Sequence, residues 1–361
     1  MNINLDNVIS IVYGIIALSL LIFVHELGHF IVARLSDVKI LTFSLGFGKK
    51  LISFKGKETE YALSLVPLGG YVKLLGESPD DVIKEEEAHR AYYNKPPLIK
   101  MLIAFTGPFF NIIFAFLLFY IVFVAGYNVL STKIGSVEKD YPAYEAGILP
   151  GDTVVAIDGV NVKEWSDIMD VMAKTDKTPL KFTIKRGDKT FDLFIAPKTI
   201  EGKNIFGETI KRRVIGITAS NDFLKKKEDI IGAIPKAVYQ TYFLSKVTVL
   251  GIIKLVEGSI SPKQIGGPLL ILEVAGKQAK EGKKNLIYFV AIISINLAVI
   301  NLLPIPILDG GHILFHIIEL ITRRRLSQRA MDISQKVGMG VLIAIMALAF
   351  FNDITRMFFG K

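Results

Sequence analysis

A long apolar run near the N-terminus constrains the fold of this chain more than any other feature. The run covers roughly residues 8 to 33 and is long enough to cross a bilayer as a helix. It nevertheless contains three ionisable residues within five positions, His25, Glu26 and His29. An ionisable side chain at the centre of a membrane helix costs at least about 2.5 kcal/mol, so these three need partners or a function.

The spacing of these three residues is the His-Glu-x-x-His pattern. On a helix, His25 and His29 lie one turn apart on the same face, so both imidazoles can reach one metal ion. Glu26 lies beside them and could accept a proton from a metal-bound water. These are the minimal residues of a zinc hydrolase. The alternative is a polar cluster that only pairs with other helices, but metal ligation also explains the spacing.

Three further apolar runs predict a polytopic α-helical membrane protein with four transmembrane helices. They cover about residues 98 to 124, 286 to 303 and 337 to 351. The composition agrees, because 51% of the 361 residues are hydrophobic and 21% are charged. The net charge of +9 could suggest nucleic acid, but Lys and Arg mostly flank the apolar runs. We therefore expect contact with the lipid bilayer and no nucleic-acid partner.

The residue pattern changes between the predicted spans. Residues 40 to 75 alternate like strands with glycines at the turns, which predicts a membrane-associated β-hairpin or sheet. Residues 129 to 200 contain strand-like segments around a helical pattern at 165 to 173, which predicts an inserted α+β domain. Within it, Ala143 to Gly159 resembles the core of a PDZ domain, a module that binds peptides by adding a strand to a sheet edge.

These patterns divide the chain into four parts. Residues 1–128 form the first two spans with the cytoplasmic β region, and residues 129–200 form the PDZ-like domain. Residues 201–283 form a connecting region with interfacial amphipathic helices, and residues 284–361 contain the last two spans. Within the connecting region, the apolar stretch 234–257 carries one charged stripe, which favours a helix lying along the bilayer over a spanning helix.

The third apolar run ends in a helix break that marks a site. Two prolines follow Asn301 and must end or kink the helix, and free backbone groups at membrane depth are tolerated only inside protein or beside a cavity. Asp309 follows this break at the depth of the two histidines. A catalytic zinc usually has three protein ligands, so Asp309 is the candidate third ligand. A helix N-cap or turn role before the next two glycines is an equal alternative.

Other polar residues are weaker candidates. His312 and His316 lie four residues apart and could also bind a metal, but they follow the helix break. His89 lies in a charged loop, where we expect it to be solvated. In the second apolar run, Asn111 and Gly107 belong to a small and polar stripe suited to close helix packing. An interhelical hydrogen bond is at least as good an explanation of Asn111 as a catalytic role.

Five segments occur in the order found in the site-2 protease family of intramembrane zinc metalloproteases, and the chain resembles the RseP/RasP-like branch of that family. They are HELGHF, TGPFFN, the PDZ-like insert, GGP and NLLPIPILDGGH. The resemblance implies Zn²⁺ as the cofactor, with the ligands His25, His29 and Asp309, and Glu26 as the catalytic base. Some members have two PDZ domains in tandem, whereas this chain has one such domain.

The resemblance also implies residues that bind the substrate. Asn301 would help to hold the substrate backbone. Gly69, Gly70 and Tyr71 would pair with an unwound segment of the substrate, whose free donors and acceptors need partners in lipid.

The function implied is that of a zinc metalloendopeptidase in regulated intramembrane proteolysis. It would cut a peptide bond within or near the transmembrane segment of single-pass membrane proteins, such as anti-sigma factors or remnant signal peptides, usually after a first external cut. A peptide ligand or the end of a substrate would bind the PDZ-like domain. The alternative is a catalytically inactive, membrane-anchored PDZ scaffold, which the intact His-Glu-x-x-His pattern disfavours.

The distribution of basic residues predicts the orientation. Residues 34–100 and 312–336 are rich in Lys and Arg, which is typical of the cytoplasmic side. With four spans, both termini and the PDZ-like domain then lie on the extracytoplasmic side of a bacterial inner membrane. The active site lies toward the cytoplasmic side.

Overall fold

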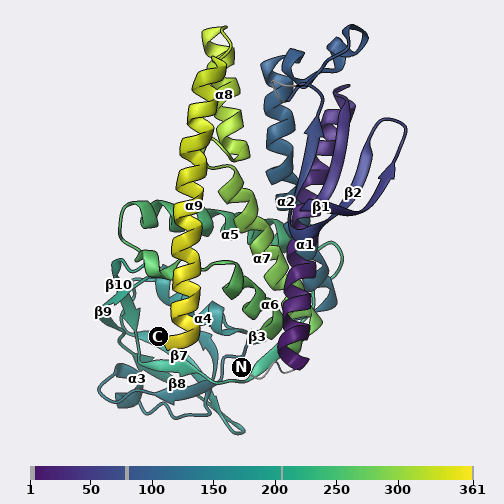
Figure 1. Cartoon of the computed structure of the whole chain (residues 1–361). Helices are drawn as coiled ribbons and strands as arrows, with labels where there is room; N and C mark the ends of the chain where they lie inside the picture. The colour runs from purple at the N-terminus through teal and green to yellow at the C-terminus, as the bar shows by residue number, and fades with distance from the viewer. Residues whose placement is uncertain (1–4, 78–80, 205, 360–361) are drawn as a thin grey trace. The chain divides into compact units, whose positions relative to one another are not determined.

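The computed structural model describes residues 5–77, 81–204 and 206–359, which divide into two compact units (Figure 1). Unit 1 comprises Met1–Val122, Ile234–Ile253 and Ser261–Lys361, and unit 2 comprises Phe123–Ala233 and Lys254–Ile260. Unit 1 therefore combines segments from both ends of the chain, which contain the apolar runs.

Unit 1 is mainly helical. Its α-helices are α1 (Leu5–Leu35), α2 (Pro97–Ala125), α5 (Ala233–Val256), α6 (Pro268–Glu281), α7 (Lys283–Asn301), α8 (Asp309–Thr322) and α9 (Gln328–Phe359). Short 3-10 helices are η1 (Glu85–Arg90), η2 (Tyr92–Asn94) and η3 (Pro262–Gln264). Among the described residues, α1, α2, α7 and α9 are long and apolar enough to cross a membrane, which fits the four predicted spans. Helix α5 does not meet this criterion.

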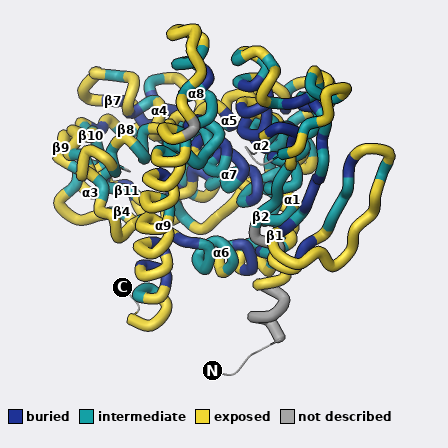
Figure 2. The backbone as a smooth tube through the Cα atoms, turned by 45° about the horizontal axis from the view of Figure 1, so that its top comes forward, coloured by how far each residue is buried: buried dark blue, intermediate teal, exposed yellow. Residues whose placement is uncertain are grey.

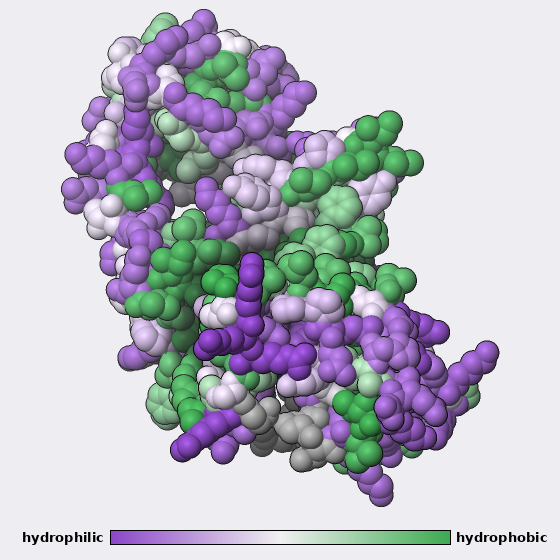
Figure 3. Space-filling model, turned by 90° about the horizontal axis from the view of Figure 1, so that it is seen from above, coloured by the Kyte–Doolittle hydropathy of each residue, from purple (hydrophilic) through white to green (hydrophobic). Residues whose placement is uncertain are grey.

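Exposed apolar side chains agree with a membrane protein. Helix α9 is exposed along most of its length, whereas α7 is largely buried or half-buried (Figure 2). In the space-filling view, hydrophobic residues lie exposed beside hydrophilic ones (Figure 3). Soluble proteins rarely expose large apolar patches, whereas an exposed apolar surface is expected where lipid covers the protein. Helix α9 also begins nine residues before the predicted span, since polar residues can continue a helix outside the apolar run.

The predicted strand region forms a folded-back sheet from β1 (Ile40–Lys55) and β2 (Glu60–Leu74). Ser44 of β1 is paired with Tyr71 on one side and with Ala62 on the other. Strand β1 reverses near Gly46 and Gly48, whose φ angles of 92° and 84° suit glycine. As a result, residues 70–74 pair with β1 on only one side and form an outer strand of the described sheet.

A small apolar cluster fixes this sheet to the helices. Ala33 at the end of α1 packs with Val38, Ile40 and Leu74 of the adjoining loop and sheet, and with Ile103 of α2. All five side chains are buried. The base of the sheet is therefore held where α1 and α2 meet.

Unit 2 is an α+β unit. Its strands are β3 (Tyr127–Leu130), β4 (Ile134–Val137), β5 (Thr153–Ile157), β6 (Val160–Asn161), β7 (Leu180–Arg186), β8 (Lys189–Ile195), β9 (Lys198–Lys203), β10 (Thr209–Val214), β11 (Ile217–Ala219) and β12 (Phe223–Lys226). Its helices are α3 (Pro142–Glu145) and α4 (Trp165–Lys174). Four strands form one sheet in the order β6-β5-β7-β8. Pairing of β4 with β11 and of β3 with β12 continues the unit past residue 200.

An ion pair between a buried aspartate and a partly exposed arginine connects a turn of unit 2 to its sheet. The Asp152 side chain is 1% exposed and accepts hydrogen bonds of 2.7 Å from both Nε and Nη2 of Arg186. The backbone N–H of Leu149 donates to the same carboxylate. Burial raises the pKa of Asp152, but Arg186 and this N–H outweigh it, and the pKa lies below its ordinary value.

We expect Asp152→Asn to lower the free energy of unfolding of unit 2 by about 1.5–3 kcal/mol, because it removes a charge-assisted pair of hydrogen bonds. Trp165, the only tryptophan, packs against the core of this unit, so its fluorescence during urea unfolding of the full chain reports the change. Because folding lowers the pKa of Asp152, this stabilisation is complete above the ordinary carboxyl pKa and is lost as the pH falls through the folded value.

The matched control is Asp192→Asn, which removes an exposed pair with Lys181. We expect a much smaller change for the control, because the pair is exposed to solvent. Equal midpoints for the two variants would contradict the role assigned to Asp152.

Candidate metal centre

Two helices bring the three predicted ligands together. His25 and His29 lie one turn apart on α1, and Asp309 is the first residue of α8. The Nε2 atom of His25 lies 3.0 Å from Oδ2 of Asp309, and Nε2 of His29 lies 3.4 Å from Oδ1. The two Nε2 atoms are 3.2 Å apart. Among the described residues, these three form the one group of His and carboxylate side chains arranged to hold a metal ion.

The three donor atoms fit a zinc ion. Ligand atoms bound at about 2.05 Å to a tetrahedral centre lie about 3.3 Å apart. The two Nε2 atoms have nearly this separation, and so does each Nε2 atom from its nearer oxygen of Asp309. The donor set of two imidazoles and one carboxylate is also typical of catalytic zinc, which keeps its fourth position open. The chain has no cysteine, so no thiolate can compete as a ligand.

The outer side of His29 is fixed by α2. Its Nδ1 lies 2.7 Å from the backbone carbonyl oxygen of Ile103, which can only accept a hydrogen bond. Nδ1 therefore carries a proton, and in the neutral imidazole the lone pair is on Nε2, which faces the other two proposed ligands. Such outer partners orient metal-binding histidines in many proteins.

Two glycines allow α1 and α2 to approach this closely. A Cβ atom at Gly28 would lie 2.3 Å from the carbonyl oxygen of Thr106, and one at Gly107 would lie 2.3 Å from Nε2 of His29. The first overlap could be relieved only by moving the helices apart, and the second would displace the His29 imidazole. The small-residue stripe expected in the second apolar run thus lies against the metal centre.

The helix break positions Asp309. Helix α7 ends at Asn301, and α8 starts at Asp309 after the proline-containing turn. A Cβ at Gly310 would lie 2.3 Å from the carbonyl oxygen of Leu302, so the turn packs directly on the start of α8. The N-cap of α8 is Leu308, and the Asp309 carboxylate points to the two histidines. The N-cap alternative therefore does not describe this residue.

Glu26 lies next to the outer strand of the sheet. A Cβ at Gly70 would lie 3.0 Å from Cγ of Glu26 and 3.1 Å from Cγ2 of Ile22. Its carboxylate has no hydrogen bond or ion pair with the residues that the structure describes. The group is therefore free to exchange a proton with a molecule beside the metal centre.

The remaining predicted site residues lie in the same unit. Gly69 precedes Gly70 in β2, and a Cβ there would lie 1.9 Å from the Phe47 ring. Tyr71 stacks on that ring with a centroid separation of 6.2 Å. Asn301 is the half-buried last residue of α7, and no hydrogen bond ties its side chain to the described site residues.

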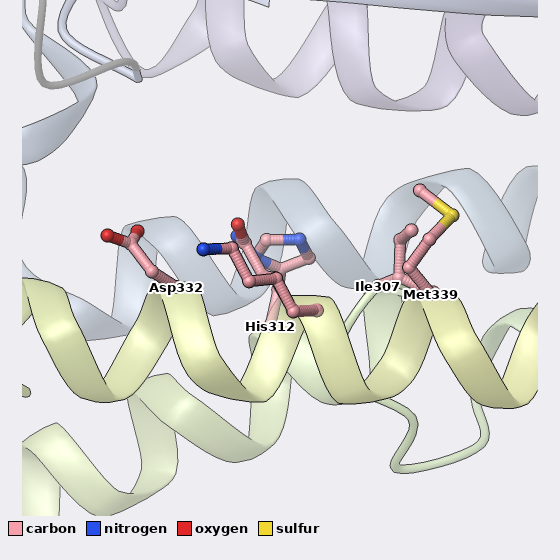
Figure 4. A pocket seen from close by; sticks show the side chains of 6 residues that line it. Ile307, His312, Asp332 and Met339 are labelled. Atoms are coloured by element: carbon pink, nitrogen blue, oxygen red, sulfur yellow. The ribbon is translucent and has the colours of Figure 1, made fainter.

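The weaker candidate ligands lie outside the three-residue cluster. His312 is one turn beyond Asp309 and lines a cleft of about 460 Å³ between α8 and α9 with Ile307, Asp332 and Met339 (Figure 4). Burial lowers the pKa of His312, which favours the neutral imidazole. His89 is largely exposed, as expected for a solvated loop residue.

A buried polar network next to α8 was not anticipated from the sequence. The hydroxyl of Tyr92 lies 3.0 Å from Nε2 of His316, and Nδ1 of His316 lies 3.3 Å from Glu319. Lys100 of α2 contacts the same carboxylate at 3.5 Å. Burial lowers the pKa of His316, so Tyr92 donates to a neutral imidazole. The signal was available as a lysine at the start of an apolar run.

Asp353 of α9 is a second missed residue. Its carboxylate is almost fully buried and accepts hydrogen bonds from the backbone N–H groups of Gly267, Leu269 and Leu270 at the start of α6. A carboxylate at this position satisfies free donors of the helix terminus. An aspartate near the end of an apolar run was the signal that could have found it.

Comparison with known proteins identifies the family of this chain. Residues 13–345 match the family described as Peptidase family M50. The chain belongs to peptidase family M50. It is 38% identical over 342 residues to a protein of Campylobacter jejuni named as a candidate zinc metalloprotease, covering 95% of this chain and 92% of that protein. This M50 peptidase is therefore a metalloprotease of the site-2 type.

Two other relatives carry the same description. A Helicobacter pylori protein is 36% identical over 359 residues, covering 96% of this M50 peptidase and 99% of the relative. A Clostridium acetobutylicum protein is 34% identical over 345 residues, with coverages of 96% and 97%. The likeness thus extends over both units and supports a zinc-dependent enzyme.

One solved structure is similar to a quarter of this peptidase. The PDZ domain of the SdrC-like protein from Listeria monocytogenes covers 25% of this chain and 85% of its own, with 26% identity and a TM-score of 0.19. A score this low leaves the fold of unit 2 to be judged from its own strands and helices.

We expect Gly107→Ala to weaken zinc binding by about ten- to a hundredfold, because the new methyl group would overlap His29 and displace a proposed ligand. Zinc bound to the purified full chain, measured against a competing chelator, tests this. Gly340→Ala in α9 is the matched control, because a Cβ there meets nothing within 4 Å. Equal zinc affinity for the two variants would show that α1 and α2 need not approach so closely.

Proposed function

We propose that this chain is an intramembrane zinc protease that cuts single-pass membrane proteins within or near their transmembrane segment. The observation that carries the proposal is the cluster of His25, His29 and Asp309. The two histidines lie in α1, a candidate span, and Asp309 begins α8, which follows the candidate span α7. A hydrolytic centre at this depth suits substrates that are themselves embedded in the bilayer. Anti-sigma factors and remnant signal peptides, usually after a first external cut, are examples of such substrates.

The three clustered side chains are the proposed zinc ligands. The Nε2 atoms of the two histidines lie 3.2 Å apart, and they lie 3.0 and 3.4 Å from the nearer oxygen of Asp309, which supports this assignment. A zinc ion bound there would polarise the scissile carbonyl group and lower the pKa of a water molecule. With three protein ligands, a zinc ion would keep a coordination position available to water or substrate.

Glu26 is the proposed general base. It lies next to His25 in α1, and its carboxylate is not engaged by other described residues. It would accept a proton from the attacking water and return it to the amine that leaves, which is the usual division of labour for a single carboxylate in peptide hydrolysis. The peptide C–N bond breaks, and the products are a carboxylic acid and a free amine.

The outer strand of the sheet is the proposed site for the substrate backbone. A helical substrate must unwind before its carbonyl groups can react, and unwound backbone in lipid needs hydrogen-bond partners. Residues 70–74 pair on only one side, and Gly70 lies beside Glu26. Strand addition at this edge would hold the scissile bond near the base. Asn301 is proposed to contact the same segment.

The orientation is also a proposal. The Lys and Arg residues between the first two spans favour the cytoplasmic side for the sheet and the metal centre. Unit 2 would then lie outside the cytoplasm. Its antiparallel sheet and the helix α4 support a PDZ-like domain that binds a peptide ligand or the trimmed end of a substrate.

An inactive membrane-anchored scaffold is the second candidate. Unit 2 as a peptide-binding domain is the feature that would favour it. The close fit of three donor atoms and the free carboxylate of Glu26 favour the enzyme, because a scaffold needs neither.

We expect Glu26→Gln to keep one zinc ion per chain and to lower the rate of cleavage by about 10²–10⁴-fold, because only the base is lost. Asp309→Asn should lose both zinc and cleavage. Zinc content and cleavage of a model single-pass substrate are measured with purified protein in detergent. Asp332→Asn, which changes a carboxylate of the neighbouring cleft, is the control and should keep both.

Full cleavage by Glu26→Gln would contradict the proposed mechanism. Wild-type protein without zinc and without cleavage would favour the scaffold.

We expect Gly70→Val to lower cleavage by about 100-fold while zinc content stays unchanged, because the new side chain would contact Glu26 and shift the edge of the sheet. Ala62→Val is the matched control, since Ala62 lies on the other side of Ser44 in the same sheet. Equal rates for the two variants would count against a substrate strand beside Gly70.

A further inference from the structure

The side chain of Asn111 lies beside Nδ1 of His25, on the side of the imidazole away from Asp309, and one of its amide atoms has no described partner. Asn111 is completely buried in α2, and its Nδ2 lies 3.3 Å from Nδ1 of His25. Its Oδ1 is buried and has no hydrogen-bond partner among the described residues. A buried amide oxygen without a partner costs about 1–3 kcal/mol, so this arrangement requires an explanation.

The protonation of His25 decides which amide atom must face it. In a neutral imidazole one nitrogen donates a hydrogen bond and the other accepts one. If Nδ2 of Asn111 donates to Nδ1, the proton of His25 is on Nε2 and points at Asp309, 3.0 Å away. That tautomer cannot bind a metal through Nε2. With a metal on Nε2, the proton is on Nδ1 and needs an acceptor behind it.

A rotation of the amide by 180° supplies this acceptor. The two ends of an asparagine amide have nearly the same shape, so exchanging them changes no packing. The exchange places Oδ1 opposite Nδ1 of His25. It breaks no existing hydrogen bond of Oδ1, since that atom has none among the described residues. Nδ2 then takes the position without a described partner, so the number of unpaired amide atoms does not change.

We propose that Asn111 is a positioning residue of the metal centre, whose amide oxygen accepts a hydrogen bond from Nδ1–H of His25 and fixes the tautomer that binds zinc through Nε2. This inference rests on the proposed zinc site. It gives Asn111 a role beyond joining two helices.

The position of Asn111 in α2 supports the assignment. Residues 103, 107 and 111 lie on one face of this helix, four residues apart. The carbonyl of Ile103 accepts from His29, Gly107 makes room for the imidazoles, and Asn111 faces His25. One helix face thus provides an acceptor for each histidine. The acceptor for His29 is backbone, whereas the acceptor for His25 is a side chain and can be changed by mutation.

Helix α7 holds this part of α2 in place. The buried hydroxyl of Ser294 donates a 2.7 Å hydrogen bond to the backbone carbonyl of Asn111. The contact fixes the backbone without using the amide. Removing this hydroxyl therefore provides a control, because it removes a hydrogen bond to the backbone of Asn111 but leaves the side-chain amide next to His25.

The test compares zinc affinity in Asn111→Leu, Asn111→Asp and Ser294→Ala, using the purified full chain and a competing chelator. Asn111→Leu keeps the size of the side chain but has no acceptor, and zinc should bind about 10–100-fold more weakly. Asn111→Asp keeps an acceptor, so its affinity should stay within about threefold of wild type or rise. Ser294→Ala should also remain within about threefold, because the amide is unchanged.

The visible absorption of bound Co²⁺ gives a readout that does not depend on catalysis. The d–d bands should be altered in Asn111→Leu and be close to wild type in Asn111→Asp. Circular dichroism and elution in detergent show whether each variant folds. If Asn111→Leu does not fold, the zinc affinity of Asn111→Asp still tests the proposal. A role in packing alone predicts weaker zinc binding for this variant, because its buried charge disturbs the packing, whereas the proposed role predicts that the affinity is kept.

Two results would overturn the proposal. Wild-type zinc affinity in Asn111→Leu would show that His25 needs no acceptor, and equal losses in Asn111→Leu and Asn111→Asp would show that only packing matters. Failure of the zinc site itself is distinguishable, because wild type and Glu26→Gln would then also bind no zinc. If both bind zinc and Asn111→Leu matches them, only the role of Asn111 is wrong.

Discussion

The central constraint on this protein is the burial of two imidazoles and two carboxylates at the depth of its membrane-spanning helices. Each group loses water there, and three of the four form contacts with one another. His25, His29 and Asp309 find one another, and His29 also donates to the carbonyl of Ile103. A divalent cation among them would compensate the carboxylate charge. The arrangement of helices around the site follows from keeping these groups together.

Two features of the helices bring these side chains together. Helices α1 and α2 approach through Gly28 and Gly107, where any side chain would collide with the other helix or the imidazoles. The chain after Asn301 leaves helical geometry at two prolines and returns to it at Asp309, which aims the carboxylate at the histidines. The sheet then lies beside Glu26, with an outer strand that pairs on one side only.

Much of this could be predicted from the sequence, because it depends on local spacing. The apolar runs predicted the long helices, and the four-residue spacing predicted that His25 and His29 share a face. The local pattern allowed Asp309 to be either a metal ligand or a helix N-cap. Only the packing of α8 against α1 in the folded structure shows that its carboxylate points to the two histidines. The network of Tyr92 and His316 and the folded-back pairing of β1 depend on contacts between distant residues, which spacing does not encode.

X-ray absorption at the zinc edge of the purified, catalytically silent Glu26→Gln chain tests the central claim most directly. The account predicts one zinc ion per chain with only nitrogen and oxygen neighbours at about 2.0–2.1 Å, and the scattering pattern of two imidazoles. The Asp309→Asn chain should lose this signal. Three or more imidazoles around the zinc, or an unchanged spectrum in Asp309→Asn, would contradict the ligand set on which the account depends.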